Sequence, residues 1–167
     1  MCGIIGFTGR KPAKDILIDG LERLEYRGYD SAGIALLNDD DTLTIRKKAG
    51  RVSELRELCK DGDYSSTCGI GHTRWATHGG VTDANAHPHR CGNVALIHNG
   101  IIENYSDIIR EYGLADKLVS ETDSEVVAAL LDTLYDGDPI AAIRKAVKII
   151  AGSFALCIMF ADRPGLI

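Results

Sequence analysis

The stretch MCGIIGF, residues 1–7, places a cysteine and a short apolar run at the very start of the chain. Two interpretations are open. The run can be a first β-strand in which Cys2 is an ordinary apolar residue. In the second interpretation Met1 is removed, and Cys2 becomes the first residue with both a thiol and a free α-amine. The second interpretation predicts a nucleophile at the end of the chain, and that nucleophile needs partners elsewhere in the sequence.

The composition is that of an ordinary globular protein. The chain has 167 residues, of which 45% are hydrophobic and 26% charged, enough for one domain with a sizeable core. A net charge of −5 argues against a nucleic-acid surface. The sequence has no apolar run of roughly 18 residues and no N-terminal signal peptide. We therefore expect a cytoplasmic protein with neither a nucleic-acid nor a membrane partner.

The cysteines do not form a disulfide framework. There are five, at positions 2, 59, 68, 91 and 157, and they include no CxxC pair. An odd number without regular spacing is typical of reduced thiols in a cytosolic protein.

Hydrophobic periodicity predicts a mixture of strands and helices. Strands are expected over residues 2–9, 31–38, 42–47, 67–75, 93–99 and 153–162. Helices are expected over residues 12–26, 53–62, 106–113, 120–137 and 138–150, and a polar loop over 76–92. A turn at 162–165 precedes an apolar pair that looks like the start of another strand. We therefore expect the domain to be truncated at its C-terminus.

Two of the predicted helices have clear start signals. Thr122 and Glu125 have the spacing of a capping box at the start of the helix over 120–137, which Gly137 is expected to end. The sequence Asp138-Pro139 favours the start of the next helix. Its inward face is predicted to be Ile140, Ile143, Val147 and Ile150.

A close group of imidazole and thiol side chains invites a metal interpretation. His87, His89 and Cys91 alternate along the chain, and His72 and His78 lie upstream. Zinc sites use such ligands, but here the second pair lacks the usual zinc spacing. The alternative is a tight loop held by imidazole hydrogen bonds. We expect neither a metal nor another cofactor.

Four further features supply what acyl transfer from an amino-acid amide needs. An N-terminal α-amine has a pKa near 8, so it can act as the base for the Cys2 thiol. A side-chain amide beside an exposed backbone N–H, as in Asn99-Gly100, can stabilise an oxyanion. Arg74 can grip a carboxylate with two hydrogen bonds, and Asp123 can accept from an ammonium group.

Each of these residues also has a structural interpretation, as do Trp75, Arg27 and Asp30. Arg27 and Asp30 could form a surface ion pair. Arg74 could cap a strand end, and Trp75 could belong to the core. Asp123 could simply sit at a helix start, where the dipole favours negative charge. Asn99-Gly100 is a common turn dipeptide after a strand.

Several longer stretches resemble the glutaminase domains of the glutamine–fructose-6-phosphate aminotransferase family, which are class II glutamine amidotransferases. The matching stretches occur in the family's order: MCGIIGF, LEYRGYDSAGIA, HTRWATHG, NAHPH, HNGIIENY, SETDSEV and GSFAL. The resemblance implies an α+β fold of the N-terminal nucleophile hydrolase type. Such a fold is a four-layer αββα sandwich with mainly antiparallel sheets. Residues 1–167 would be one glutaminase domain, incomplete at its C-terminus.

The same resemblance implies catalytic roles for matching residues. Cys2 attacks the amide carbon of glutamine once Met1 is removed, with its own α-amine as general base. Asn99 and Gly100 form the oxyanion hole. Arg27 and Gly28 position the N-terminal residue.

It also implies the residues that bind the substrate. Arg74 holds the substrate carboxylate, and Asp123 holds its amine. Thr77 and His78 add contacts in the same pocket. Trp75 resembles an aromatic gate between the glutaminase site and an ammonia passage.

The partners implied are L-glutamine and the sugar-isomerase domains of a full-length chain, which bind fructose 6-phosphate and assemble as a homo-oligomer. No cofactor is implied. The alternative is a glutamine-binding or assembly fragment without turnover, because of truncation or a retained Met1.

Overall fold

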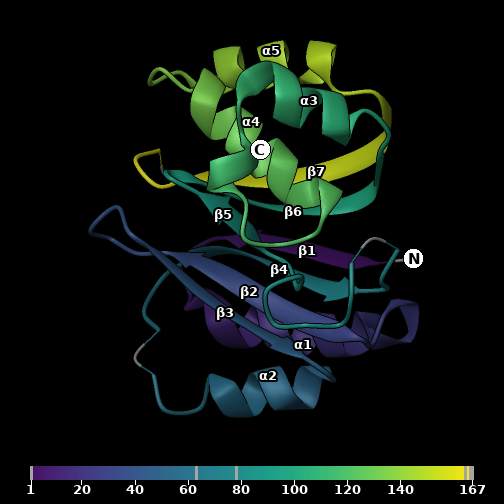
Figure 1. Ribbon diagram of the computed structural model, residues 1–167. Coiled ribbons are helices and arrows are strands. Elements are labelled where there is room, and N and C mark those ends of the chain that lie inside the picture. The colour runs from purple at the N-terminus through teal and green to yellow at the C-terminus, as the bar shows by residue number, and fades with distance from the viewer. Residues whose placement is uncertain (1, 63, 78, 164, 166–167) are drawn as a thin grey trace.

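Two antiparallel β-sheets pack face to face between two layers of helices (Figure 1). The computed structural model describes residues 2–62, 64–77, 79–163 and 165. The layer order is helices, sheet, sheet, helices, so the expected four-layer α+β sandwich is confirmed. The strand expected to begin at residues 166–167 lies outside the described residues.

The first sheet has the strand order β1-β4-β2-β3, with every pair antiparallel. Its strands are β1 (Gly3–Thr8), β2 (Ser31–Leu37), β3 (Leu43–Ala49) and β4 (Cys68–Arg74). Its outer face is covered by α1 (Ala13–Leu24) and α2 (Val52–Leu58), and the short helix η1 (Glu25–Arg27) follows α1. The register pairs Gly3 with Thr73, so the start of β1 and the end of β4 lie side by side.

The second sheet has the order β5-β6-β7 and is also antiparallel. Its strands are β5 (His89–Cys91), β6 (Val94–Ile102) and β7 (Gly152–Phe160). Its outer face is covered by α3 (Tyr105–Tyr112), α4 (Asp123–Leu134) and α5 (Pro139–Ile149), and η2 (Ala115–Lys117) links α3 to α4. Strand β5 lies inside the segment expected to be a loop.

Strand β6 runs three residues beyond its predicted end and includes the dipeptide Asn99-Gly100. The turn interpretation of this dipeptide is wrong, because Asn99 pairs with Ala155 and Gly100 with Phe154 on β7. Gly100 has a φ of +145°, and a Cβ at this position would lie 2.0 Å from the Ser153 carbonyl oxygen. Only glycine can therefore occupy this point of the strand.

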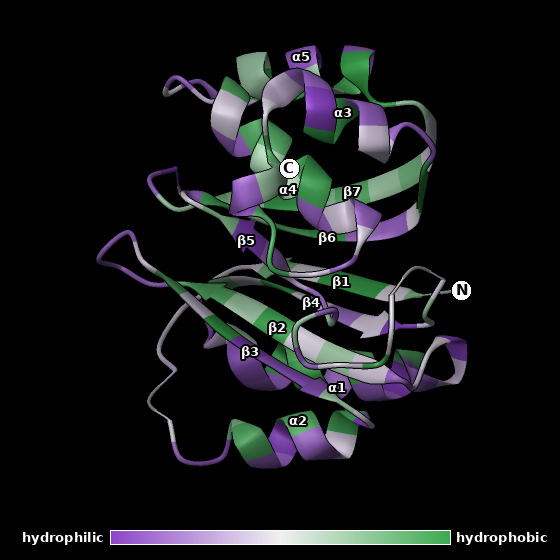
Figure 2. Cartoon of the chain, viewed as in Figure 1, coloured by the Kyte–Doolittle hydropathy of each residue, from purple (hydrophilic) through white to green (hydrophobic). Residues whose placement is uncertain are grey.

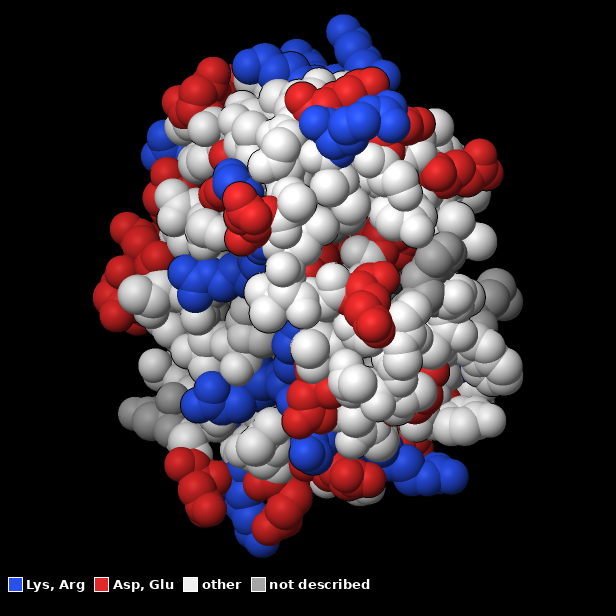
Figure 3. Space-filling model, viewed as in Figure 1, with Lys and Arg blue, Asp and Glu red and all other residues white. Residues whose placement is uncertain are grey.

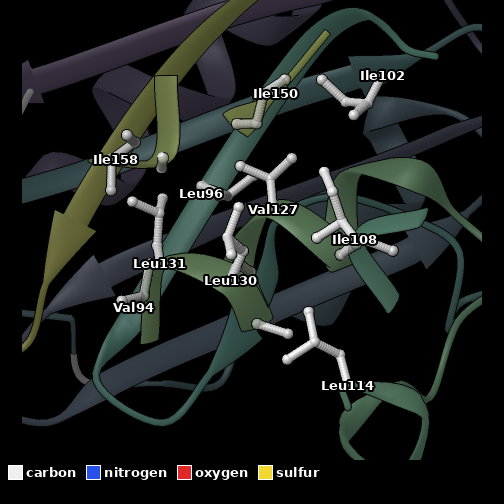
Figure 4. Close-up of a cluster of buried hydrophobic side chains, with 14 of the residues drawn as sticks. Val94, Leu96, Ile102, Ile108, Leu114, Val127, Leu130, Leu131, Ile150 and Ile158 are labelled. Carbon is white, nitrogen blue, oxygen red and sulfur yellow. The ribbon is translucent and has the colours of Figure 1, made fainter. Parts of the chain in front are cut away.

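In the described part of the chain, buried hydrophobic residues form three clusters, each packed between two neighbouring layers. Figure 4 shows the cluster between the second sheet and its helices, where Leu96 and Ile158 from the strands meet Val127 and Leu131 from α4. The first nine residues of α4 are buried, so this helix is enclosed on all sides near its start. A second cluster packs α1 and α2 on the first sheet, and a third fills the space between the sheets.

Helix α5 presents a different face to the core from the one predicted. Its buried residues are Ala142 and Ala146, while Ile140 and Val147 are 46% and 47% exposed. Ile143 and Ile150 do pack on the core, as expected. Small side chains let α5 lie close to the layer beneath it, and this packing overrides the larger apolar residues of the expected stripe.

The predicted helix ends also differ from those observed. Helix α4 ends at Leu134, three residues before Gly137, and α2 ends at Leu58 instead of Gly62. The start signal at Asp138 is confirmed, because its side chain accepts from the N–H groups of Ile140 and Ala141.

The outer surface is polar and mixed in charge. Figure 2 shows hydrophobic residues concentrated along the strands and the inward sides of the helices. Basic and acidic side chains are interspersed on the face shown in Figure 3. None of the helices in the described part of the chain is both long and apolar enough to cross a bilayer.

Candidate active site

Cys2 is fixed immediately before β1 by backbone contacts on both sides. Gly3 N–H donates to the Thr73 hydroxyl at 3.2 Å, and Arg27 Nε donates to the Cys2 carbonyl at 3.3 Å. The Cys2 Sγ accepts from the Trp75 N–H at 3.5 Å. The thiol is half-buried and held at the end of β4.

Gly28 lies against the same strand end. A Cβ on Gly28 would lie 2.6 Å from the carbonyl carbon of Arg74 and 3.0 Å from the Trp75 nitrogen. Its backbone is extended, with a φ of −171°, so the close approach rather than the conformation requires glycine. Any side chain here would displace the N–H group that contacts the Cys2 sulfur.

Arg74 is the last residue of β4 and is only 3% exposed. Its guanidinium donates to the carbonyls of Gly80 at 3.0 Å and Gly79 at 3.4 Å. Trp75 follows outside the strand and is half exposed, with its ring edge-on to that of Tyr29. The interpretation of Trp75 as a core residue is therefore wrong.

Asp123 is the first residue of α4 and is 5% exposed. One carboxylate oxygen, Oδ2, accepts from the Ile102 N–H at 2.8 Å. The position at a helix N-terminus favours its negative charge. Thr122 caps the helix by accepting from the Glu125 N–H, while the Glu125 carboxylate bonds to the N–H groups of Val119 and Ser120. Only half of the predicted capping box is thus formed.

A cavity joins these elements where the ends of β4 and β6 meet the start of α4. The space between its walls, with the open solvent at its mouth included, is about 280 Å³. Six of the predicted site residues line it: Cys2, Arg74, Trp75, Thr77, Gly100 and Asp123. Asn99 lies beside Gly100 on β6 and is half-buried. The remaining substrate contact expected from the sequence, His78, lies outside the described residues.

Four further residues line the cavity that the sequence did not single out as substrate contacts: His87, His98, Thr122 and Ser124. His98 and Ser124 occur inside the stretches HNGIIENY and SETDSEV, directly beside Asn99 and Asp123. Their proximity to those residues in the sequence is the signal that could have identified them.

Asn85 connects the loop before β5 to the segment before α4. Its side-chain amide donates to the Gly80 carbonyl at 3.0 Å and to Glu121 Oε2 at 2.9 Å, and its oxygen accepts from the Glu121 N–H. The Gly80 carbonyl also accepts from Arg74. The hydrogen bonds of Asn85 therefore help to fix the loop whose carbonyl groups accept from the Arg74 guanidinium.

Three histidine rings contact one another at the cavity, and one of them, His87, lines it. The rings of His72 and His87 lie 4.0 Å apart between centroids, and His89 meets His87 edge-on at 4.5 Å. His89 Nε2 is 3.0 Å from the Thr122 hydroxyl, whereas both ring nitrogens of His87 are buried without a hydrogen-bond partner. Cys91 contacts Asp132 instead of this stack. The described residues contain no group of three or more side chains arranged to hold a metal ion.

Burial disfavours the charged form of all three rings. It lowers the pKa of His72 to about 3 and the pKa values of His87 and His89 well below 6.5. At these three positions the unfolded chain binds more protons than the folded chain below pH 6.5, so the stability that the neutral rings contribute is lost as the pH falls below that value. Each histidine contributes at most about 1.4 kcal/mol per pH unit to this loss, a slope reached about one unit below pH 6.5.

We therefore expect His87→Gln to reduce the slope of unfolding free energy against pH by about 0.7 kcal/mol per unit at pH 6.5, rising to about 1.4 kcal/mol per unit at pH 5. Denaturant unfolding at several pH values measures the slope, which does not depend on how far the substitution lowers absolute stability. A slope equal to that of the unsubstituted chain would show that His87 is charged in the folded state.

Comparison with known proteins places this arrangement in a family. A sequence profile described as a glutamine amidotransferase domain matches residues 72–167, more than half of the chain. The chain is 51% identical to glutamine–fructose-6-phosphate aminotransferase (isomerizing) of Caldanaerobacter subterraneus, over 100% of this chain and 28% of that protein. It is 48% identical to the protein of the same name from Aquifex aeolicus, over 98% of this chain and 28% of that protein.

Solved structures show the same fold. Glutamine phosphoribosylpyrophosphate amidotransferase of B. subtilis, in complex with ADP and GMP, superposes with a TM-score of 0.81 at 26% identity, over 96% of this chain and 35% of that one. A structure described as the allosteric regulatory enzyme of purine biosynthesis gives 0.82 at 28% identity, over 96% of this chain and 36% of that one. The expected N-terminal nucleophile fold is confirmed, and the chain belongs to the glutamine amidotransferase domain family.

Proposed function

We propose that the chain hydrolyses L-glutamine to glutamate and ammonia, with Cys2 as the nucleophile. The observation that carries this proposal is the shared cavity of a terminal cysteine, a buried arginine and a buried aspartate. These groups come from the residue before β1, the end of β4 and the start of α4, which lie far apart in the sequence. An amino acid with a side-chain amide is complementary to all three.

Arg74 and Asp123 recognise the two charges of the substrate backbone. The guanidinium can form two parallel hydrogen bonds with a carboxylate, and the aspartate can accept from an ammonium group. Both side chains are nearly buried, so these contacts are screened little by water. Thr77 and His78 are assigned to the same subsite from the sequence. The carboxamide is then directed toward the Cys2 sulfur.

The reaction is an acyl transfer in two steps. The α-amine of Cys2 takes the thiol proton, and the sulfur attacks the amide carbon to form a tetrahedral intermediate. The C–N bond breaks as the amine returns the proton to the leaving nitrogen, which departs as ammonia and leaves a glutamyl-thioester. Water then gives a proton to the α-amine and attacks the thioester; the C–S bond breaks, glutamate is released, and the proton returns to the sulfur to regenerate the thiol. The amine is available only after Met1 has been removed.

Asn99 and Gly100 stabilise the charged oxygen of the intermediate. Gly100 lines the cavity, and its unusual backbone conformation is enforced by contact with β7. A side-chain amide and a backbone N–H in such a position are the donors that an oxyanion needs. Arg27 and Gly28 hold the nucleophile in place through the contacts described above.

In a longer protein, the released ammonia would be the nitrogen donor for a second reaction. The chain spans about 28% of the length of the curated relatives, which are named for transfer of the glutamine nitrogen to fructose 6-phosphate. We assign the ammonia to such a transfer by sugar-isomerase domains of the same protein, with Trp75 as the gate. That full-length protein would be a cytoplasmic homo-oligomer.

Covalent labelling tests the proposal directly. A chloroketone analogue of glutamine should label Cys2 in protein whose intact mass lacks one methionine, and excess glutamine should prevent the labelling. Burial raises the pKa of the other four thiols, at Cys59, Cys68, Cys91 and Cys157, so they provide an internal control. Equal labelling of all five cysteines, or a retained Met1 without labelling, would contradict the proposal and favour a fragment without turnover.

A further inference from the structure

A chain of buried polar contacts runs from the first sheet to the substrate site. His72 Nε2 donates to the carbonyl of His98 on β6 at 2.9 Å. The His98 ring nitrogen Nδ1 lies 2.8 Å from the Ser124 hydroxyl, which in turn lies 3.4 Å from Asp123 Oδ1. All four residues are at most 5% exposed. Two strands from different sheets and the start of α4 are therefore joined at this point.

The two carboxylate oxygens of Asp123 are held differently. Oδ2 accepts from a backbone N–H of β6 at 2.8 Å, whereas Oδ1 is approached by the Ser124 hydroxyl at 3.4 Å. A carboxylate fixed through one oxygen can still rotate about its Cβ–Cγ bond. A second donor restricts that rotation and so sets the direction from which an ammonium group is accepted.

The number of available protons shows how His98 can set the direction of the Ser124 O–H bond. The Ser124 hydroxyl has one proton and faces two potential acceptors, His98 Nδ1 and Asp123 Oδ1. When His98 carries its proton on Nδ1, it donates to the serine oxygen. The serine proton then points to Asp123, where the negative charge strengthens the bond.

We propose that Ser124, oriented by His98, is a positioning residue that sets the plane of the Asp123 carboxylate for the α-ammonium group of glutamine. The inference rests on the proposed function, in which Asp123 binds that group. Ser124 also lines the cavity, so its hydroxyl is close to the subsite that it arranges. The consequence is selectivity: loss of the hydroxyl weakens only ligands that carry the α-amine.

The test compares two ligands in the full chain. L-Glutamine and glutaramate share the carboxamide and the carboxylate, but glutaramate lacks the α-amine. Calorimetry in a Cys2→Ala background measures binding without turnover. Ser124→Ala should weaken glutamine binding about three- to tenfold and change glutaramate binding less than about twofold. With Cys2 present, KM for glutamine should rise by the same factor and kcat should stay nearly unchanged.

A matched variant separates positioning from a general effect on α4. Thr133 is another hydroxyl residue of this helix, bonded to the Ala129 carbonyl at 2.8 Å and outside the cavity. Thr133→Ala should leave the affinity of both ligands unchanged. Equal weakening of both ligands by Ser124→Ala, or no weakening of glutamine, would overturn the role of Ser124. If the chain with Ser124 intact binds the two ligands equally, the assignment of Asp123 fails as well, and the proposed function with it.

Discussion

Replacing Cys2 with alanine will lower the rate of glutamine hydrolysis by at least about a thousandfold, because the substitution removes the thiol proposed to form the thioester. Glutamine binding will be nearly unchanged, since Arg74 and Asp123 are positioned by β4, β6 and the loop around Gly80 and not by the sulfur. Glutamate release measures the first effect, and calorimetry measures the second.

A second cysteine substitution provides the control. Cys91 is half-buried at the end of β5, where its sulfur lies 3.7 Å from Asp132. Cys91→Ala will keep hydrolysis within about twofold of the unsubstituted chain, because the residue lies outside the cavity. Normal glutaminase activity in the Cys2→Ala variant would show that the nucleophile is a different group.

Replacing Arg74 with lysine will raise KM for glutamine about a hundredfold. Lysine keeps the positive charge but cannot form two parallel hydrogen bonds with a carboxylate, and its shorter reach also loses the loop carbonyls of Gly79 and Gly80. The fall in kcat will be smaller, because the reacting carboxamide is at the opposite end of the substrate. Steady-state kinetics over a wide range of glutamine concentrations separates the two parameters.

Arg90 is the matched control for this substitution. It lies on the short strand β5, is exposed, and donates from Nε to the Gly92 carbonyl at 3.0 Å. Arg90→Lys will leave KM within about twofold. Unchanged KM in Arg74→Lys would mean that the substrate carboxylate is bound elsewhere.

Most strands could be predicted because their signal is local. All seven residues of β2 are buried, and the run SAGIALL is apolar enough to indicate a central strand without any knowledge of its neighbours. Strand β5 was not predictable, because three residues carry no periodicity and it forms only through pairing with β6. The extension of β6 through Gly100 likewise depends on β7, which lies more than fifty residues later.

Helix α5 shows that hydropathy alone does not predict which side chains of a helix are buried. Its apolar residues predict an inward face that includes Ile140 and Val147, yet both are half exposed. The alanines Ala142 and Ala146 face the core because their size permits a close approach of the helix. A hydrophobic pattern ranks residues by transfer free energy, whereas packing also depends on volume.

The sequence by itself determined the chemistry available to this protein: a cysteine at its second position, and arginine, aspartate and an Asn-Gly pair in stretches typical of one family of amidotransferases. Tertiary structure alone decided which side chains share the cavity and how they are held. Strand register brings Cys2 beside the end of β4 seventy residues later, and packing of α4 on β6 brings Ser124 to His98 and Asp123. The physical reason is that periodicity records which residues leave water, while distances between remote residues follow from the pairing and packing of whole elements.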